Sequence, residues 1–233
     1  MRASQGRNQP LPPRGGRLPG EGLRVVLTSL FTASLVVANL AASKLIQVWW
    51  LIFPAGTLAY CITFLCTDVY AEFFGKRETE FVVLAGFVAN VLMVVLIKLS
   101  IAAPIAPFQS EYQEVYAQVL GPTERIVLAS MAAYLVAQSH DVWAYHLWGR
   151  LTGGKHLWLR NNASTMVSQL IDTAVFTFIA YWGVAPLNTL LSMVLALYIV
   201  KWFIALCDTP FCYLSVYAVR RFTGLKPVWV KGA

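Results

Sequence analysis

The stretch "LWLRNNASTMVSQLIDTAVF", from Leu157 to Phe176, begins as a polar segment and then becomes apolar enough to enter a membrane. An aspartate, Asp172, nevertheless lies well inside the apolar part. A charge near the centre of a bilayer costs at least about 2.5 kcal/mol on insertion scales, so Asp172 should face protein or water rather than lipid. The segment therefore predicts a membrane helix that has a polar inner face.

The composition of the whole chain is that of a membrane protein. Of its 233 residues, 58% are hydrophobic and only 12% are charged, whereas soluble domains carry about 25% charged residues. The mean hydropathy is +0.62. Stretches long enough to cross a bilayer as a helix, which takes about 20 residues, are 23–47, 53–75, 81–102, 126–148, 165–183 and 187–219. They lack the alternation of transmembrane strands, so we predict an all-α membrane protein with a bundle of six transmembrane helices.

Basic residues predict how this bundle is oriented. Fourteen of the 18 lysines and arginines lie before or at the start of the first stretch, after the second, between the fourth and fifth, or after the last. These positions share one face of a bundle with an even number of spans, so both termini are expected to be cytoplasmic. The net charge of +7 follows from this asymmetry, and no nucleic-acid partner is needed to explain it.

The predicted domain organisation is one membrane domain between two tails. Residues 1–22 contain four arginines, four prolines and five glycines, and they are expected to form a disordered basic cytoplasmic tail. Residues 23–221 form the six-helix domain, and residues 222–233 form a short cytoplasmic tail. The C-x4-C spacing of the four cysteines fits no zinc site, and neither a metal nor a cofactor is expected.

Ionisable residues inside the predicted helices indicate a functional site. Four aspartates lie 8 to 12 residues from basic residues at the helix ends, or roughly 12–18 Å deep. They are Asp68, Asp141, Asp172 and Asp208, and Glu72 lies one turn after the first of them. Internal ion pairs, such as Asp208 with Lys201 or Asp68 with Lys44, are an alternative for any single carboxylate. Two lysines cannot neutralise five acids, so a polar interior that binds a ligand is predicted.

Neutral polar side chains accompany the carboxylates at helical spacing. Gln169 precedes Asp172 by three residues, Gln138 precedes Asp141 by three, and Asn39 lies in the first stretch. Each alone is more often a contact between helices than a ligand contact. Aromatic side chains are also near, at Trp143, Tyr145, Tyr70 and Tyr60. The combination suits a flat polar heterocycle, because rings can stack on its faces while carboxylates and amides bind its edge.

Four segments carry a family resemblance: "ANLAASKLI", "FPAGTLAYCITFLCTDVYAEFFGKR", "ASMAAYLVAQSHDVWAYHLW" and "LWLRNNASTMVSQLIDTAVF". In this order and spacing they closely resemble the queuosine precursor transporters, also called the vitamin uptake transporter family, over about residues 26–221. The resemblance implies a multi-pass importer of the bacterial or archaeal inner membrane that carries 7-deazaguanines, such as 7-cyano- and 7-aminomethyl-7-deazaguanine. It also implies a fold related to substrate-binding subunits of energy-coupling vitamin importers.

The resemblance assigns the aspartates of the family to three positions, Asp68, Asp141 and Asp172, with Gln138, Ser164 and Thr165 beside them. One carboxylate can accept hydrogen bonds from both the N1–H and the exocyclic amine of a deazaguanine. An aminomethyl arm would add a cation for a second carboxylate. The expected substrate-binding residues are Asp68, Glu72, Gln138, Asp141, Gln169, Asp172, Asn39, Lys44 and Asp208.

Several alternatives stay open at this point. A membrane enzyme would need a nucleophile–base or metal signature, and the sequence lacks H-E-x-x-H, G-x-S-x-G and a clustered set of metal ligands. An ion channel lined by carboxylates would conduct without saturable uptake. The chain could also bind its substrate while an energy-coupling partner drives transport, form a homo-oligomer, or carry another purine-like or vitamin substrate.

Overall fold

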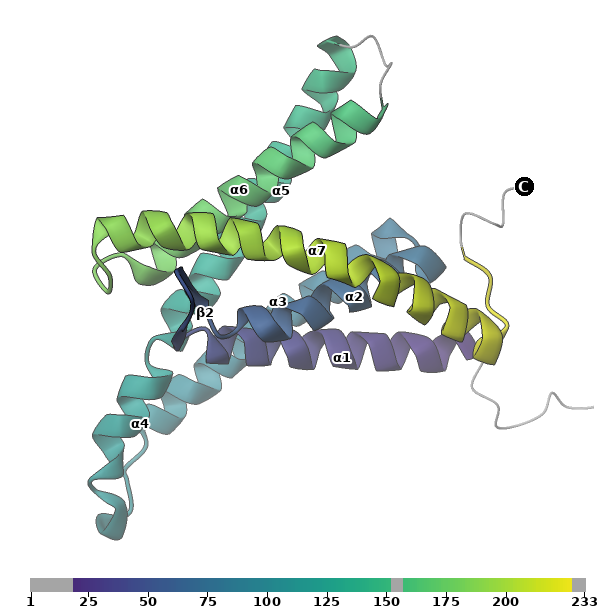
Figure 1. The fold of residues 1–233 in the computed structure, drawn as a ribbon. Helices are drawn as coiled ribbons and strands as arrows, with labels where there is room; N and C mark the ends of the chain where they lie inside the picture. Colours follow the sequence, from purple (N-terminus) through teal and green to yellow (C-terminus); the bar gives the residue numbers. More distant parts are fainter. Residues whose placement is uncertain (1–18, 152–156, 228–233) are drawn as a thin grey trace, which may run out of the picture.

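The computed structural model of the protein describes residues 19–151 and 157–227, and both parts are almost entirely helical (Figure 1). The α-helices of these parts are α1 (Pro19–Ala41), α2 (Thr57–Phe74), α3 (Lys76–Ala102), α4 (Tyr112–Leu120), α5 (Thr123–Leu151), α6 (Leu157–Tyr181) and α7 (Leu187–Thr223). Within the described residues, five helical segments are long and apolar enough to cross a membrane, and α6 adds a shorter apolar segment, Met166–Tyr181. The prediction of an all-α membrane protein is confirmed.

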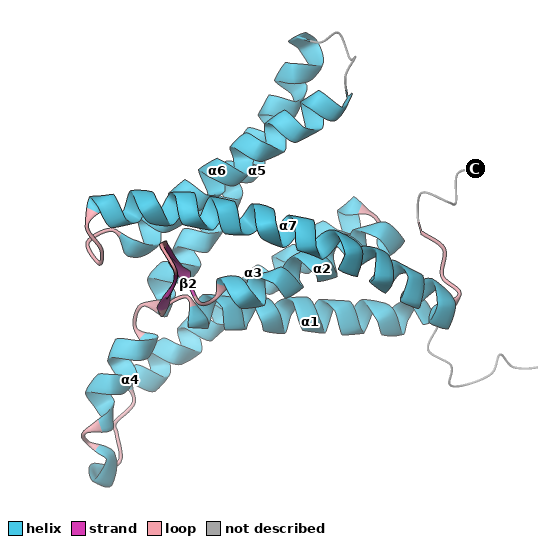
Figure 2. Ribbon diagram, viewed as in Figure 1, coloured by secondary structure: helices cyan, strands magenta, loops and turns pink. Residues whose placement is uncertain are grey.

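A short hairpin interrupts the first two predicted spans. Strand β1 (Leu45–Val48) pairs with the antiparallel strand β2 (Leu51–Pro54), which Figure 2 shows as the strand pair among the helices. The first helix therefore ends at Ala41 and the second begins at Thr57. The expected bounds of 23–47 and 53–75 were wrong here, because hydrophobicity alone does not distinguish a short apolar strand from part of a helix.

The connection between α3 and α5 contains a 3-10 turn, η1 (Pro107–Gln109), and the short helix α4. Helix α4 is fastened to the end of α3 by two side-chain contacts. The Gln113 amide donates to the carbonyl of Ile101 at 2.8 Å, and the hydroxyls of Tyr116 and Ser100 lie 2.9 Å apart.

A single glycine separates α2 from α3. Gly75 has φ 87°, which lies in the region that favours glycine, and its N–H donates to the carbonyl of Ala71. The chain therefore reverses without a longer loop, and α3 returns beside α1. Gly86 of α3 faces α1 so closely that a Cβ there would lie 2.6 Å from the Phe31 ring and 2.8 Å from the Leu35 side chain.

Apolar side chains hold the helices together in two clusters. The first joins α1 to α2 and includes Leu27, Phe31, Leu35, Val69, Tyr70 and Phe73. The second joins α5, α6 and α7 and includes Ile126, Ala129, Ala180, Tyr181, Leu190 and Met193. Helices α5 and α6 run together as a long hairpin, and α7 crosses that hairpin and packs against α2 (Figure 1).

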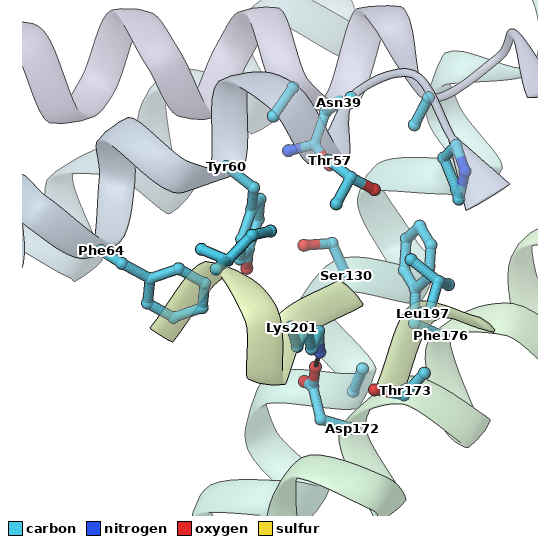
Figure 3. A pocket seen from close by; sticks show the side chains of 16 residues that line it. Asn39, Thr57, Tyr60, Phe64, Ser130, Asp172, Thr173, Phe176, Leu197 and Lys201 are labelled. Carbon is cyan, nitrogen blue, oxygen red and sulfur yellow. Dashed lines mark hydrogen bonds and ion pairs between the residues drawn. The ribbon is translucent and has the colours of Figure 1, made fainter. Parts of the chain in front are cut away.

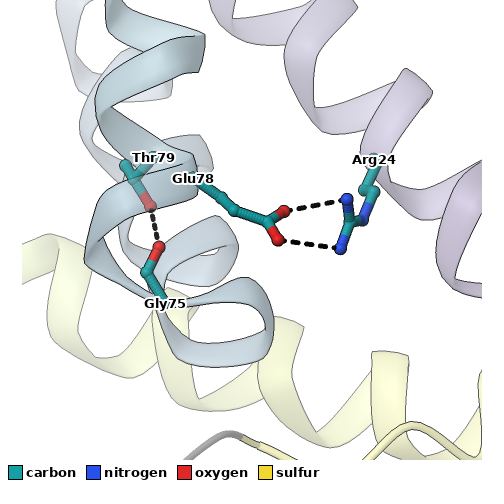
Figure 4. A network of polar contacts seen from close by, with 4 residues as sticks. All are labelled: Arg24, Gly75, Glu78 and Thr79. Atoms are coloured by element: carbon teal, nitrogen blue, oxygen red, sulfur yellow. Dashed lines mark hydrogen bonds and ion pairs between the residues drawn. The ribbon is translucent and has the colours of Figure 1, made fainter.

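The beginning of α1 and the end of α7 lie at the same end of the molecule (Figure 1). There the Arg24 guanidinium pairs with the Glu78 carboxylate through bonds of 2.8 and 3.2 Å (Figure 4). The same guanidinium lies 4.5 Å from the centre of the Phe74 ring. A Cβ on Gly20 would lie 3.7 Å from the Leu225 side chain. The chain thus enters and leaves the bundle at one end, while the cytoplasmic orientation stays a prediction.

Candidate functional site

Two adjoining cavities lie between the helices. The Lys201 cavity is lined by α1, α2, α5, α6 and α7 and holds about 630 Å³ of space between atoms, including its open part (Figure 3). The Gln138 cavity is lined by α1, α2, α3, α5 and α6 and holds about 940 Å³ on the same measure. Tyr60, Phe64 and Asp172 line both cavities and therefore form the boundary between them.

Asp172 forms an ion pair at this boundary. The Nζ atom of Lys201, on α7, lies 2.5 Å from the Oδ2 atom of Asp172, on α6 (Figure 3). Only 24% of the Asp172 side chain and 15% of the Lys201 side chain are exposed. The lysine that the sequence suggested as a partner for Asp208 is therefore bound to Asp172. The pair explains how a carboxylate can lie in the apolar part of α6.

Buried amides connect the wall of the Lys201 cavity to α3. Asn39 lines this cavity from α1, and its Nδ2 donates to Oδ1 of Asn90 at 2.8 Å. The Asn90 amide in turn donates to the carbonyl of Gly86 at 2.9 Å. Asn39 is 5% exposed and Asn90 is 1% exposed, so this chain of bonds also fixes the contact between α1 and α3.

Two glutamines reach the Gln138 cavity from neighbouring helices. Gln138 comes from α5 and Gln169 from α6, and both are half-buried. Ser168 lines the same cavity, and its hydroxyl lies 3.0 Å from Nδ1 of His140. The structure thus brings Gln138, Gln169 and Asp172 to one cavity.

Three of the expected residues line neither cavity. Asp68 is exposed and Glu72 is half-buried on α2, whereas the cavity face of that helix presents Thr63 and Thr67. Successive residues of a helix are rotated by about 100°, which carries Asp68 off this face. Lys44 is exposed in the turn before β1 and, within the described part of the chain, forms no ion pair. The alternative pairing of Lys44 with Asp68 is therefore not formed.

The other expected residues lie where the structure does not describe side chains. Asp141 belongs to α5 and Asp208 to α7, but their side chains are outside the described part. The same holds for Ser164 and Thr165 on α6. Their roles stay predictions.

Sequence reasoning missed several residues of the cavity walls. Phe64 lies one turn after Tyr60, and the two rings meet edge to face with their centres 5.3 Å apart. Tyr134 lines the Gln138 cavity and meets the Phe87 ring in the same way at 5.1 Å. Lys201 was considered only as a partner for a carboxylate. The four-residue spacing of Tyr60 and Phe64 was the available signal, but aromatic pairs at this spacing are also common in apolar packing.

The arrangement suits a small polar molecule with a flat apolar body. Its walls combine the Asp172–Lys201 pair, the amides of three residues and the rings of Tyr60 and Phe64. Among the described residues, no group of three His, Cys, Asp or Glu side chains could hold a metal ion. Apolar helices around cavities that contain such polar groups are the arrangement of a multi-pass membrane protein, and such cavities are typical of transport proteins.

Comparison with known proteins places the chain in a family of this class. Residues 54–215 match the family described as "Putative vitamin uptake transporter", and the chain belongs to this family. It is 31% identical to the "Probable queuosine precursor transporter" of Bacillus subtilis over 182 residues, which cover 77% of this chain and 79% of that protein. It is 28% identical to the "Queuosine precursor transporter" of Escherichia coli over 127 residues, or 54% of each chain. No solved structure matches.

The family confirms two predictions from the sequence. The resemblance stated on the four quoted segments is correct. The protein is a transporter and not an enzyme, because its family is one of transporters.

Proposed function

We propose that the protein imports queuosine precursors, small 7-deazaguanine bases such as 7-cyano- and 7-aminomethyl-7-deazaguanine, across the inner membrane of a bacterial or archaeal cell. The observation that carries the proposal is the position of Asp172 on the boundary of both cavities, in a chain related to proteins named queuosine precursor transporters. The proposal includes cytoplasmic termini and a membrane domain at 23–221 between two tails. The first helix already begins at Pro19, so the expected disorder does not extend to residues 19–22. The proposal also includes a fold related to substrate-binding subunits of energy-coupling vitamin importers.

In this proposal the base lies beside the boundary of the two cavities. The carboxylate of Asp172 accepts hydrogen bonds from the N1–H edge of the base, because charged acceptors form stronger bonds than neutral ones. The rings of Tyr60 and Phe64 contact its flat face, since stacking a base on an aromatic side chain contributes about 1–3 kcal/mol. Gln138 and Gln169 bind its remaining polar atoms from the Gln138 cavity.

The replacement of Asp172 by asparagine tests the proposal. Asp172→Asn removes the charged acceptor at almost constant shape, and we expect uptake of the precursors to fall to background while the protein still inserts into the membrane. Glu72→Gln is the matched control, because it makes the same chemical change on a half-buried residue outside both cavities. The measurement is queuosine in the tRNA of a strain that cannot make the precursors and is fed each compound. Normal uptake by Asp172→Asn would remove Asp172 from the site.

A second experiment separates autonomous transport from the alternatives. The purified chain is reconstituted in liposomes without another protein and without ATP, and entry of a labelled precursor is followed. Saturable uptake supports an autonomous importer. Substrate binding without uptake favours an energy-coupling partner, and ion conductance without saturable uptake favours a channel. Uptake of other purines with no competition from deazaguanines would change the proposed substrate.

A further inference from the structure

The two cavities follow one another along the helices that line both of them. On α1 the Lys201 cavity is lined by Ala38, Asn39 and Ala42, where the helix ends and leads into the β1–β2 hairpin. The Gln138 cavity is lined by Phe31 and Leu35, earlier on the same helix. Helices α2, α5 and α6 show the same order, with the residue of the Lys201 cavity nearer the hairpin in each pair: Thr57 and Thr67, Ser130 and Gln138, Thr173 and Gln169.

The end of the bundle that holds the β1–β2 hairpin is common to these helices. The Tyr181 hydroxyl, at the end of α6, donates to the carbonyl of Ala42 at 2.7 Å. Ile126, near the start of α5, packs in the same apolar cluster as these two residues. The Lys201 cavity therefore lies toward the β1–β2 end, and the Gln138 cavity lies farther from it.

Both cavities offer hydrogen-bonding groups to a polar solute. The Lys201 cavity has the amide of Asn39 and the hydroxyls of Thr57 and Ser130. The Gln138 cavity has the amides of Gln138 and Gln169. Polar side chains inside membrane helices usually face protein, water or a ligand. A polar molecule thus finds partners on both sides of the boundary between the cavities.

The boundary itself consists of two rings and a carboxylate. Tyr60 and Phe64 come from α2 and meet edge to face, and Asp172 comes from α6. Figure 3 shows Tyr60 between Phe64 and Ser130. Tyr60 packs against the first apolar cluster, whereas the end of α6 belongs to the second. The boundary therefore lies between two separately packed parts, and a small displacement of one part against the other widens it without breaking either cluster.

We propose that the two cavities are successive chambers of one transport route, and that the rings of Tyr60 and Phe64 form the partition between them. The inference rests on the proposed function and adds the path that the substrate follows. With the predicted cytoplasmic termini, the Lys201 cavity is the outer chamber and the Gln138 cavity is the inner one. Helix groups that move about a central site are a common transporter design, and here that site is the partition.

The accessibility of introduced cysteines tests this route. The four native cysteines are replaced by alanine, and single cysteines are introduced at Thr57 and Thr67, which lie on α2 on opposite sides of the partition. A charged thiol reagent that cannot cross membranes is added to right-side-out or to inverted vesicles. We expect Thr57→Cys to react from the outside and Thr67→Cys from the cytoplasmic side. Ile62→Cys, exposed on α2 outside both cavities, is the control and should react from neither side.

A second variant removes part of the partition. Tyr60→Ala deletes the ring, and labelling of Thr67→Cys from the outside should become about tenfold faster or more, which corresponds to a barrier lowered by about 1.4 kcal/mol. Tyr60→Phe keeps the ring and should keep the labelling on one side. Unchanged labelling in a folded Tyr60→Ala variant excludes Tyr60 from the partition.

The outcomes separate the route from the proposed function. Reaction of Thr57→Cys and Thr67→Cys from the same side, or at neither position, refutes the route even if deazaguanines are transported. Reaction from opposite sides but in the reverse sense supports the route and overturns the predicted orientation. Reaction from the expected sides, with no slowing by the 7-cyano base and no uptake of it, supports the route and refutes the proposed function. The single-cysteine comparison decides the route even if Tyr60→Ala does not fold.

Discussion

The start of α2 lies against the backbone of α1 at Gly56 and Ala38. A Cβ on Gly56 would lie only 2.0 Å from the carbonyl oxygen of Ala38. The backbone of Gly56 has φ −56°, which any residue can adopt, so glycine is needed here for space and not for its conformational freedom. Both residues line the Lys201 cavity, and this contact therefore sets the position of one cavity wall.

We predict that Gly56→Ala displaces α2 from α1 and destabilises the protein by at least about 1–3 kcal/mol, the usual cost of overpacking. Substrate binding should fall as well, because Tyr60 and Phe64 lie on α2, which begins directly after Gly56. The measurement is the thermal unfolding midpoint in detergent, with binding of the 7-cyano base as a second readout. Gly22→Ala is the control: it lies in α1 with nothing within 4 Å of its Cβ position. Equal midpoints for the two variants would contradict the prediction.

The buried amide pair between α1 and α3 gives a second prediction. Asn90→Ala leaves Nδ2 of Asn39 without its acceptor, and we expect a loss of about 1 kcal/mol, since hydrogen bonds between membrane helices are individually modest. Asn90 lines neither cavity, so substrate affinity should change less than stability. Asn188→Ala, at an exposed position near the start of α7, should leave the unfolding midpoint unchanged. A midpoint for Asn90→Ala equal to that of the control would show that the pair does not stabilise the fold.

The fold was largely predictable because lipid restricts the possible structures. Long apolar stretches can satisfy their backbone in a bilayer only as helices or closed barrels, and this rule located every long helix. It failed near Lys44, where the hairpin of β1 and β2 replaced the ends of two predicted spans. Strand pairing there depends on contacts between two short segments, Leu45 with Pro54 and Val48 with Leu51, and hydrophobicity alone does not encode such contacts.

The site was less predictable than the fold. The sequence argument used the depth of each carboxylate below the end of its helix. This depth placed Asp172 correctly at a cavity, but it did not do so for Asp68. Depth does not determine the rotation of a helix about its axis, and rotation decides whether a side chain faces a cavity. The pairing of Lys201 was also ambiguous, because Asp208 lies seven residues away on the same helix while Asp172 lies on another. Only the packing of α6 against α7 brings Asp172 to the lysine.

Arg125, near the start of α5, provides a third prediction about stability. Its guanidinium donates to the carbonyls of Ile179 and Trp182, both at 2.6 Å, and so satisfies backbone groups that the end of α6 leaves without helical partners. Arg125→Ala should therefore destabilise the protein by about 1–2 kcal/mol. Lys98→Ala removes an exposed ion pair with Glu124 and should cost less than about 1 kcal/mol. Thermal unfolding of both variants in one detergent checks the order, and a larger effect for Lys98→Ala would contradict it.

The last prediction concerns the ring of Phe64, which lines both cavities and meets Tyr60 edge to face. If a flat base lies against this ring, Phe64→Leu keeps the apolar character but loses the stacking surface, so affinity should fall about tenfold. Phe64→Tyr keeps the ring and should retain binding. Phe81→Leu makes the same substitution at an exposed position of α3 and should have no effect. The readout is the dissociation constant of the 7-cyano base for each purified variant. An unchanged affinity in Phe64→Leu, with the unfolding midpoint preserved, would place the bound base away from Phe64 while leaving the role of Asp172 intact.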